Sequence, residues 1–177
     1  MAKTKSNTEM QCLVNNFYHS PAKKAGTVSL AHQDISTGYQ NYTTLGLTVG
    51  LPDGDKGAYW EVRIADANNQ TAPVRSYFQR TDGEDDGRAQ REFDSLIAVL
   101  AGEEHVGNAG AIVEPTGDGK TFSLKKEFVG RKFFANLVRD TNNKTNAEYF
   151  KLWNIKEPRA VGVGTSSARD AVRAKYA

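Results

Sequence analysis

Hydrophobic and polar residues alternate along five runs of the chain, and this two-residue period predicts β-strands. In the second run, Trp60, Val62 and Ile64 share one side, while Tyr59 and Arg63 belong to the other. Turn-forming residues such as those of the segment LPDGDKG separate the runs. The predicted strands lie at about 39–49, 57–66, 73–80, 131–140 and 147–155.

One helix is predicted between the third and fourth strands, at about 87–101. Phe93, Leu96 and Leu100 recur there at helical spacing and define one apolar face. Asp85 or Asp86 is suited to cap the start, and Gly102 to end the helix.

The order of three strands, a helix and two strands is the layout of the OB-fold, a small Greek-key barrel. We therefore expect a mainly β fold: an OB-fold-like five-stranded barrel with one helix between strands three and four. Peripheral strands and a flexible C-terminal tail complete this expectation. The predicted regions are an N-terminal segment at 1–36, the barrel at 37–157 and a basic tail at 158–177.

Shorter elements are expected outside the barrel. Met10, Cys12 and Val14 alternate with polar residues and predict a short first strand. Further short strands are predicted at 27–31, 110–114 and 121–129.

The strand alternation also predicts which residues form the core. The expected inward set is Leu45, Leu47, Trp60, Val62, Ile64, Val74, Phe78, Phe133, Ala135, Leu137, Phe150 and Leu152. Aromatic and basic residues share the opposite faces and the strand ends. This outward set is Tyr59, Arg63, Arg75, Tyr77, Arg80, Arg131, Lys132, Phe134, Tyr149, Lys151 and Trp153.

That mixture suits single-stranded nucleic acid. Aromatic rings stack on bases for about 1–3 kcal/mol each, and Arg or Lys beside them neutralises phosphates. We assign stacking to the aromatic members and phosphate contacts to the basic ones. Tyr18, Tyr39 and Tyr42, expected in loop or edge positions, could extend the surface. The alternative is that the aromatics pack beneath other segments or a dimer partner.

Charge and motifs narrow the function without deciding it. The net charge is only +2, so the placement of charge must carry any nucleic-acid argument. The single cysteine, Cys12, favours a reducing compartment, and no apolar run approaches the length of a membrane span. We expect a cytoplasmic protein. The N-terminus has no apolar stretch typical of a signal peptide.

Enzymatic chemistry has no positive signal in the sequence. GDGKT at 117–121 lacks the first glycine of a phosphate-binding loop, since Glu114 stands there. DGEDDG at 82–87 lacks the closing glutamate of a calcium loop, since Phe93 stands there. The three histidines are scattered. We expect a non-enzyme without metal or cofactor.

The stretch 93–157 resembles the second half of small phage-encoded single-stranded DNA-binding proteins. The likeness rests on the helix face of Phe93, Leu96 and Leu100, on Gly130-Arg131-Lys132 before a hydrophobic strand, and on Asn154-Ile155 at the end of the last strand. With the compatible layout of 38–80, it covers about two-thirds of the chain.

This resemblance implies an OB-fold that binds single-stranded DNA with little sequence preference during phage replication or recombination, in the cytoplasm of the host cell. Replication or recombination proteins, and further copies of the chain, are the implied partners. One departure concerns the end of the chain. RDAVRAKYA carries three basic residues against Asp170 alone, whereas many such proteins end in an acidic tail. A protein-interaction module, such as a phage inhibitor of a host defence complex, is the alternative function.

Overall fold

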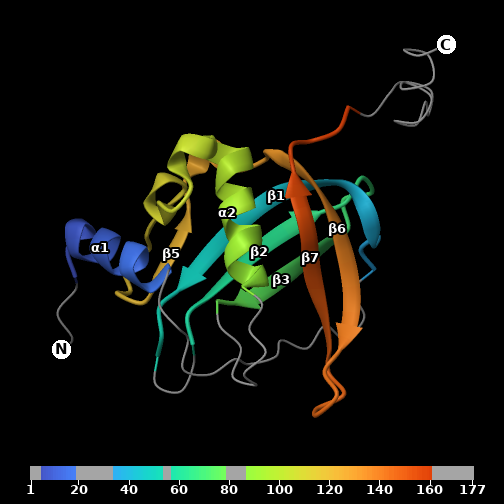
Figure 1. The fold of residues 1–177 in the computed structure, drawn as a ribbon, viewed down its shortest axis with the longest axis horizontal. Coiled ribbons are helices and arrows are strands. Elements are labelled where there is room, and N and C mark those ends of the chain that lie inside the picture. The colour runs from blue at the N-terminus through green and yellow to red at the C-terminus, as the bar shows by residue number, and fades with distance from the viewer. Residues whose placement is uncertain (1–4, 19–33, 54–56, 79–86, 161–177) are drawn as a thin grey trace.

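The computed structural model of the chain describes residues 5–18, 34–53, 57–78 and 87–160 (Figure 1). Several predictions fall outside these residues: the strand at 27–31, the helix caps Asp85 and Asp86, and nearly all of the tail. The elements in chain order are α1 (Asn7–Tyr18), β1 (Gly38–Gly50), β2 (Tyr59–Ala65), β3 (Thr71–Tyr77), α2 (Arg88–Ala101), the short 3-10 helices η1 (Glu103–His105) and η2 (Ala109–Ala111), β4 (Val113–Pro115), β5 (Thr121–Leu124), the 3-10 helix η3 (Lys126–Phe128), β6 (Lys132–Thr141) and β7 (Glu148–Lys156).

The fold is mainly β, as predicted, and all strands belong to one antiparallel sheet of seven strands. The long strand β1 organises it. One edge of β1 pairs with β2, while the other pairs with β6 at its start and with β5 at its end. β3 and β7 lie near each other, but no ladder joins them within the described strands, so the sheet stays open. A closed five-stranded barrel is therefore not formed.

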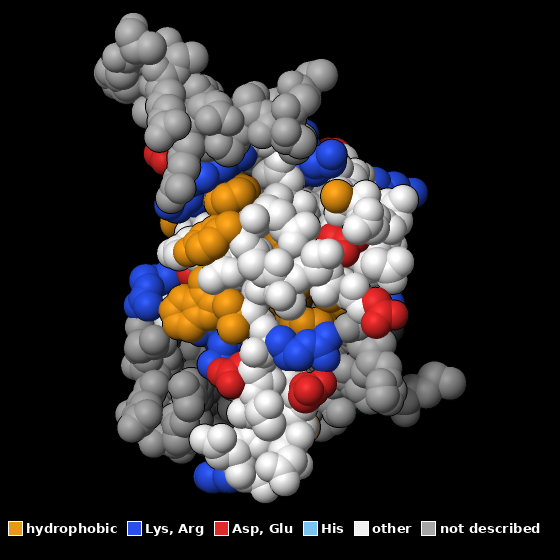
Figure 2. Space-filling model, turned by 90° about the vertical axis from the view of Figure 1, so that its right-hand side faces the viewer, with side chains coloured by type: hydrophobic (Ala, Val, Ile, Leu, Met, Phe, Trp, Pro, Cys, Tyr) orange, Lys and Arg blue, Asp and Glu red, His pale blue; other side chains and the backbone are white. Residues whose placement is uncertain are grey.

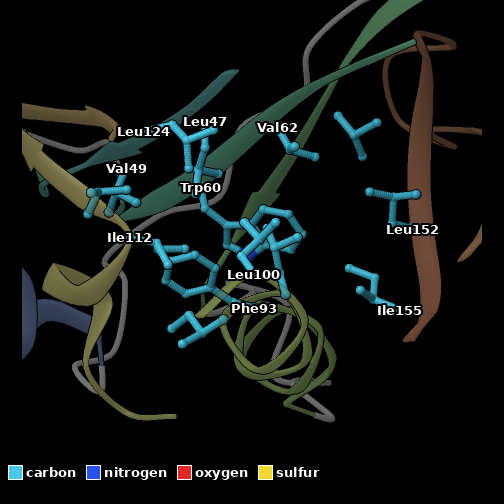
Figure 3. Close-up of a cluster of buried hydrophobic side chains, with 14 of the residues drawn as sticks. Leu47, Val49, Trp60, Val62, Phe93, Leu100, Ile112, Leu124, Leu152 and Ile155 are labelled. Atoms are coloured by element: carbon cyan, nitrogen blue, oxygen red, sulfur yellow. The ribbon is translucent and has the colours of Figure 1, made fainter. Parts of the chain in front are cut away.

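α2 lies against the sheet beside β7 and covers the core (Figure 1). The predicted apolar face of α2 is confirmed, because Phe93, Leu96 and Leu100 are fully buried. Phe93 stacks on Trp60 of β2 with ring centroids 5.6 Å apart (Figure 3). Gly102 ends the helix with φ 108°, as expected of a glycine stop. Gly87 is the N-cap residue of the helix, and a glycine has no side chain with which to cap it.

The N-terminal prediction is wrong. Residues 7–18 form α1, not a strand, and α1 packs against η2 and β4. Met10 and Val14 are buried and Cys12 is exposed. An i, i+4 pair places both apolar side chains on one face of a helix, and an alternating pattern over so few residues could not distinguish this from a strand. The N-terminal helix therefore contributes to the same hydrophobic core as the sheet.

One predicted core residue is also misplaced. The pairing of β1 with β2 shifts between Thr44 and Gly46, so Leu45 is an extra residue in a β-bulge. Thr44 points inward and is fully buried, whereas Leu45 is 38% exposed. The rest of the predicted inward set is buried. Tyr42, expected at an edge or in a loop, lies within β1 and is buried as well.

Candidate nucleic-acid interface

The predicted site residues lie in several places on the sheet. Two groups of aromatic side chains lie on the outer surface of the sheet, the side away from α2. Arg63 is exposed on β2, Arg131 and Lys132 are exposed at the start of β6, and Tyr149, Lys151 and Trp153 belong to β7. Arg80 lies outside the described residues.

The first group, here the Tyr59 cluster, comprises Tyr59, Glu61, Arg75 and Tyr77 on β2 and β3. Tyr59 and Tyr77 are cross-strand neighbours with ring centroids 5.9 Å apart. The Arg75 guanidinium lies 4.1 Å from the centre of the Tyr59 ring and 3.1 Å from Glu61 Oε1. Burial raises the pKa of the Tyr59 hydroxyl, and the nearby Arg75 opposes that rise. These rings are held in place by their own neighbours.

The second group, here the Tyr39 cluster, comprises Tyr39 of β1, Phe134 of β6 and Arg159, which follows β7. Tyr39 is 58% exposed and stacks on Phe134, with centroids 5.7 Å apart and planes at 20°. The Arg159 guanidinium lies 4.2 Å from the centre of the Phe134 ring. Phe134 is on the outer surface as predicted, but only 9% exposed, because these neighbours cover it.

Polar contacts hold the Tyr39 cluster in shape. The Nδ2 of Asn154 donates to Tyr39 Oη at 2.8 Å, which ties β7 to β1. Asn41 accepts from the Arg159 backbone N–H at 2.9 Å and donates to its carbonyl at 2.6 Å. Arg159 is thereby fixed beside the ring that it contacts.

The predicted site residues of β7 already contact other side chains of the protein. The Lys151 ammonium donates to Asp140 Oδ2 at 2.6 Å and lies 5.3 Å from the Tyr149 ring. The hydrogen bond from Lys151 lowers the pKa of Asp140. Trp153 is half-buried, with the Arg88 guanidinium 5.0 Å from its ring. Lys151 is therefore engaged by an acid, and its charge is less available to phosphate than we expected.

Figure 2 shows exposed hydrophobic side chains on the β6–β7 side of the molecule, with Lys and Arg beside several of them. The two clusters lie at opposite ends of β1. Tyr39 is near its start, and Tyr59 pairs with Gly50 at its end. Eleven residues of extended strand span up to about 36 Å, so the clusters are not one compact patch.

Between the clusters, the outer surface of β1 is flanked by two exposed cations. Lys132 of β6 pairs with Thr43, and Arg63 of β2 pairs with Gly46. Neither side chain has an acidic partner within the described residues. The outer surface of β1 thus presents aromatic rings, then two available positive charges, then aromatic rings.

Sequence reasoning missed several members of this surface. It gave Tyr39 only a secondary place, although Tyr39, Asn41 and Thr43 alternate outward in β1. That alternation was the available signal. Arg88 and Arg159 carried no such signal, because each reaches its ring from an element distant in sequence.

Two negative findings concern the part of the chain that the structure describes. No cluster of three or more His, Cys, Asp or Glu side chains is arranged to hold a metal ion there. None of the helices in the described ranges has the length and apolar character needed to cross a membrane. No protein-family model, curated protein or solved structure matches the chain.

Proposed function

We propose that the chain binds single-stranded DNA, with little sequence preference, along the outer surface of β1 and its neighbouring strands. One observation carries the proposal: Arg63 and Lys132, without acidic partners in the described residues, lie between the Tyr39 and Tyr59 clusters. A DNA strand has the matching composition, since its bases stack on rings and its phosphates attract cations.

The order of elements supports the same proposal. β1, β2, β3, α2, β6 and β7 follow one another as the parts of an OB-fold do, with β4 and β5 inserted between α2 and β6. OB-folds bind oligonucleotides on their strand surfaces. The resemblance to small phage single-stranded DNA-binding proteins extends the proposal to phage replication or recombination, within the cytoplasm of the host cell. We include OB-fold membership in the proposal.

A protein-interaction module is the second candidate. In the Tyr59 cluster, Arg75 already contacts both the Tyr59 ring and Glu61. Such internally satisfied groups suit a preformed protein-binding surface, in which rigid aromatic residues and arginine contribute much of the affinity. A phage inhibitor of a host defence complex is the concrete form of this alternative.

Fluorescence anisotropy with labelled oligo-dT tests the two candidates. If the chain binds single-stranded DNA, its affinity for oligo-dT should fall steeply between low and physiological salt. Duplex DNA of equal length should not displace the oligo-dT. The same series with oligo-U tests the preference for DNA over RNA. The absence of oligo-dT binding at low salt would reject the proposal and favour the protein-interaction module.

A further inference from the structure

A separate hollow lies where the C-terminal end of α2 meets η2, η3 and the start of β6. It has a volume of about 590 Å³ and is open to solvent. Its wall contains Lys125, Arg131, His105 and Asn108. Glu127 is the acidic residue in this wall. The hollow is within the size range of small-molecule sites, about 300–1,000 Å³.

Arg131 is fixed at this hollow. Its Nη1 donates to the Leu100 carbonyl oxygen at 2.9 Å, at the end of α2. Its guanidinium lies 5.1 Å from the Phe128 ring. A guanidinium has five N–H donors, and the bond to Leu100 uses one of them. Arg131 was expected to follow a DNA backbone with Lys132, but its side chain reaches the α2 side of the molecule instead.

Lys125 supplies a second charge. Its backbone N–H donates to the Ile112 carbonyl at 2.8 Å, which sets the position of the residue beside the hollow. Its side chain is half-buried and has no acidic partner within the described ranges. By contrast, Lys120 and Lys151 each contact an aspartate. The positive charge of Lys125 is therefore not neutralised by an acid of the described residues and can attract an anionic ligand in the hollow.

From this geometry we infer that the hollow binds a phosphate monoester. Arg131 offers remaining donors in a fixed fork, and Lys125 contributes a compact positive charge. Asn108 adds donor capacity. The phosphate could belong to the end of a nucleic-acid strand or to a free mononucleotide. The site does not depend on the proposed DNA path, which runs along the outer surface of β1.

Isothermal titration calorimetry with dTMP and with thymidine tests the inference on the full chain. We expect dTMP to bind at least about tenfold more tightly than thymidine, because only dTMP forms the charge-assisted hydrogen bonds. Lys125→Gln should weaken the binding of dTMP at least about tenfold, whereas Lys125→Arg should retain most of the affinity for dTMP. Lys144→Gln, in the exposed β6–β7 turn, is the control and should bind dTMP as the unaltered chain does.

Competition distinguishes the two sources of phosphate. A 5′-phosphorylated oligo-dT that displaces dTMP better than its 5′-hydroxyl form would identify a strand end; displacement by free nucleotides alone would identify a mononucleotide. Equal binding of dTMP and thymidine, or an unchanged dTMP affinity in Lys125→Gln, would overturn the inference. Binding of 5′-hydroxyl oligo-dT, which tests the proposed function, is measured independently.

Discussion

The Tyr59 ring lies over Gly50, its partner residue on β1, so closely that a Cβ at position 50 would overlap the ring. This contact sets the position of one of the two outer rings of the Tyr59 cluster. Gly46, four residues earlier on the same strand, has open space where its Cβ would be. The two glycines are therefore a matched pair for mutation.

Gly50→Ala should displace the Tyr59 ring and disturb its contact with Arg75. We expect a loss of about 1–3 kcal/mol in the free energy of unfolding, the usual effect of overpacking, and weaker binding of oligo-dT. Gly46→Ala should leave the free energy of unfolding close to that of the unaltered chain, because its Cβ meets no neighbour. Chemical denaturation and anisotropy measure the two effects. Equal behaviour of the two variants would mean that the ring moves away without consequence.

Removing Arg63 or Lys132 should reduce the salt dependence of DNA binding. Each lost phosphate contact lowers the slope of log affinity against log salt by about 0.7 for a single strand. We therefore expect Arg63→Gln and Lys132→Gln each to flatten the slope, and the double variant to flatten it further. Lys144→Gln, on the exposed turn, should keep the full slope. An unchanged slope in the double variant would place the DNA elsewhere on the molecule.

Trp153→Ala should lower the affinity for oligo-dT by about 1–3 kcal/mol without changing the salt slope, because stacking releases no counterions. Oligo-dT should also quench tryptophan fluorescence through Trp153. Trp60 is fully buried, and its indole N–H donates to the Ala89 carbonyl at 3.1 Å, so Trp60 should not respond. Quenching that persists in Trp153→Phe would show that Trp153 does not stack on a base.

Leu96→Ala should destabilise the chain by about 2–5 kcal/mol, as large-to-small changes in a packed core do. Leu96 is fully buried on the face of α2 that meets the sheet. Val106→Ala is the control, since Val106 is an exposed hydrophobic residue and surface changes stay within about 0.5 kcal/mol. Urea denaturation followed by circular dichroism compares them. Similar midpoints for Leu96→Ala and the unaltered chain would contradict the packing of α2.

Tyr42 should make stability depend on alkaline pH. Burial raises the pKa of its phenol to about 12, against a partial opposing effect of Gln40, and its hydroxyl lies 2.9 Å from the Ser36 carbonyl and 3.1 Å from that of Gly38. The folded state thus favours the protonated phenol. The stabilisation that protonated Tyr42 gives the folded state is complete below pH 10, the ordinary pKa of the group, and is lost as the pH rises from 10 to 12.

A shift of this size corresponds to about 2–3 kcal/mol. Melting curves between pH 9 and 12 should therefore fall more steeply for the unaltered chain than for Tyr42→Phe, which has no phenol to ionise at this position. Parallel pH profiles for the two proteins would show that Tyr42 titrates equally in the folded and unfolded states.

The sequence by itself determined the secondary structure of the central region. The five predicted strands correspond to β1, β2, β3, β6 and β7, with ends that differ by a few residues, and the predicted helix corresponds to α2. Long alternating or helical patterns report which side of an element is buried, and burial of apolar surface is the main favourable term in folding. Trp60 and Phe93 were therefore assigned to the core correctly.

Only the tertiary structure decided the details that depend on contacts between distant segments. One extra residue at Leu45 reversed the expected direction of that side chain, because a bulge shifts a two-residue period without a signal in the pattern. The short N-terminal pattern fitted a strand as well as a helix. In the folded chain this segment is the helix α1, which packs against η2 and β4.

The same limit applies to the site. Alternation placed aromatic and basic residues on the outer surface, but it could not say how far apart they lie along β1 or which charges are already paired. Lys151 meets Asp140 across β6 and β7, whereas Lys132 and Arg63 meet no acid in the described residues. The period of a strand depends on local backbone geometry, whereas strand pairing, ion pairs and the hollow beside Arg131 depend on which segments of the chain come together in space.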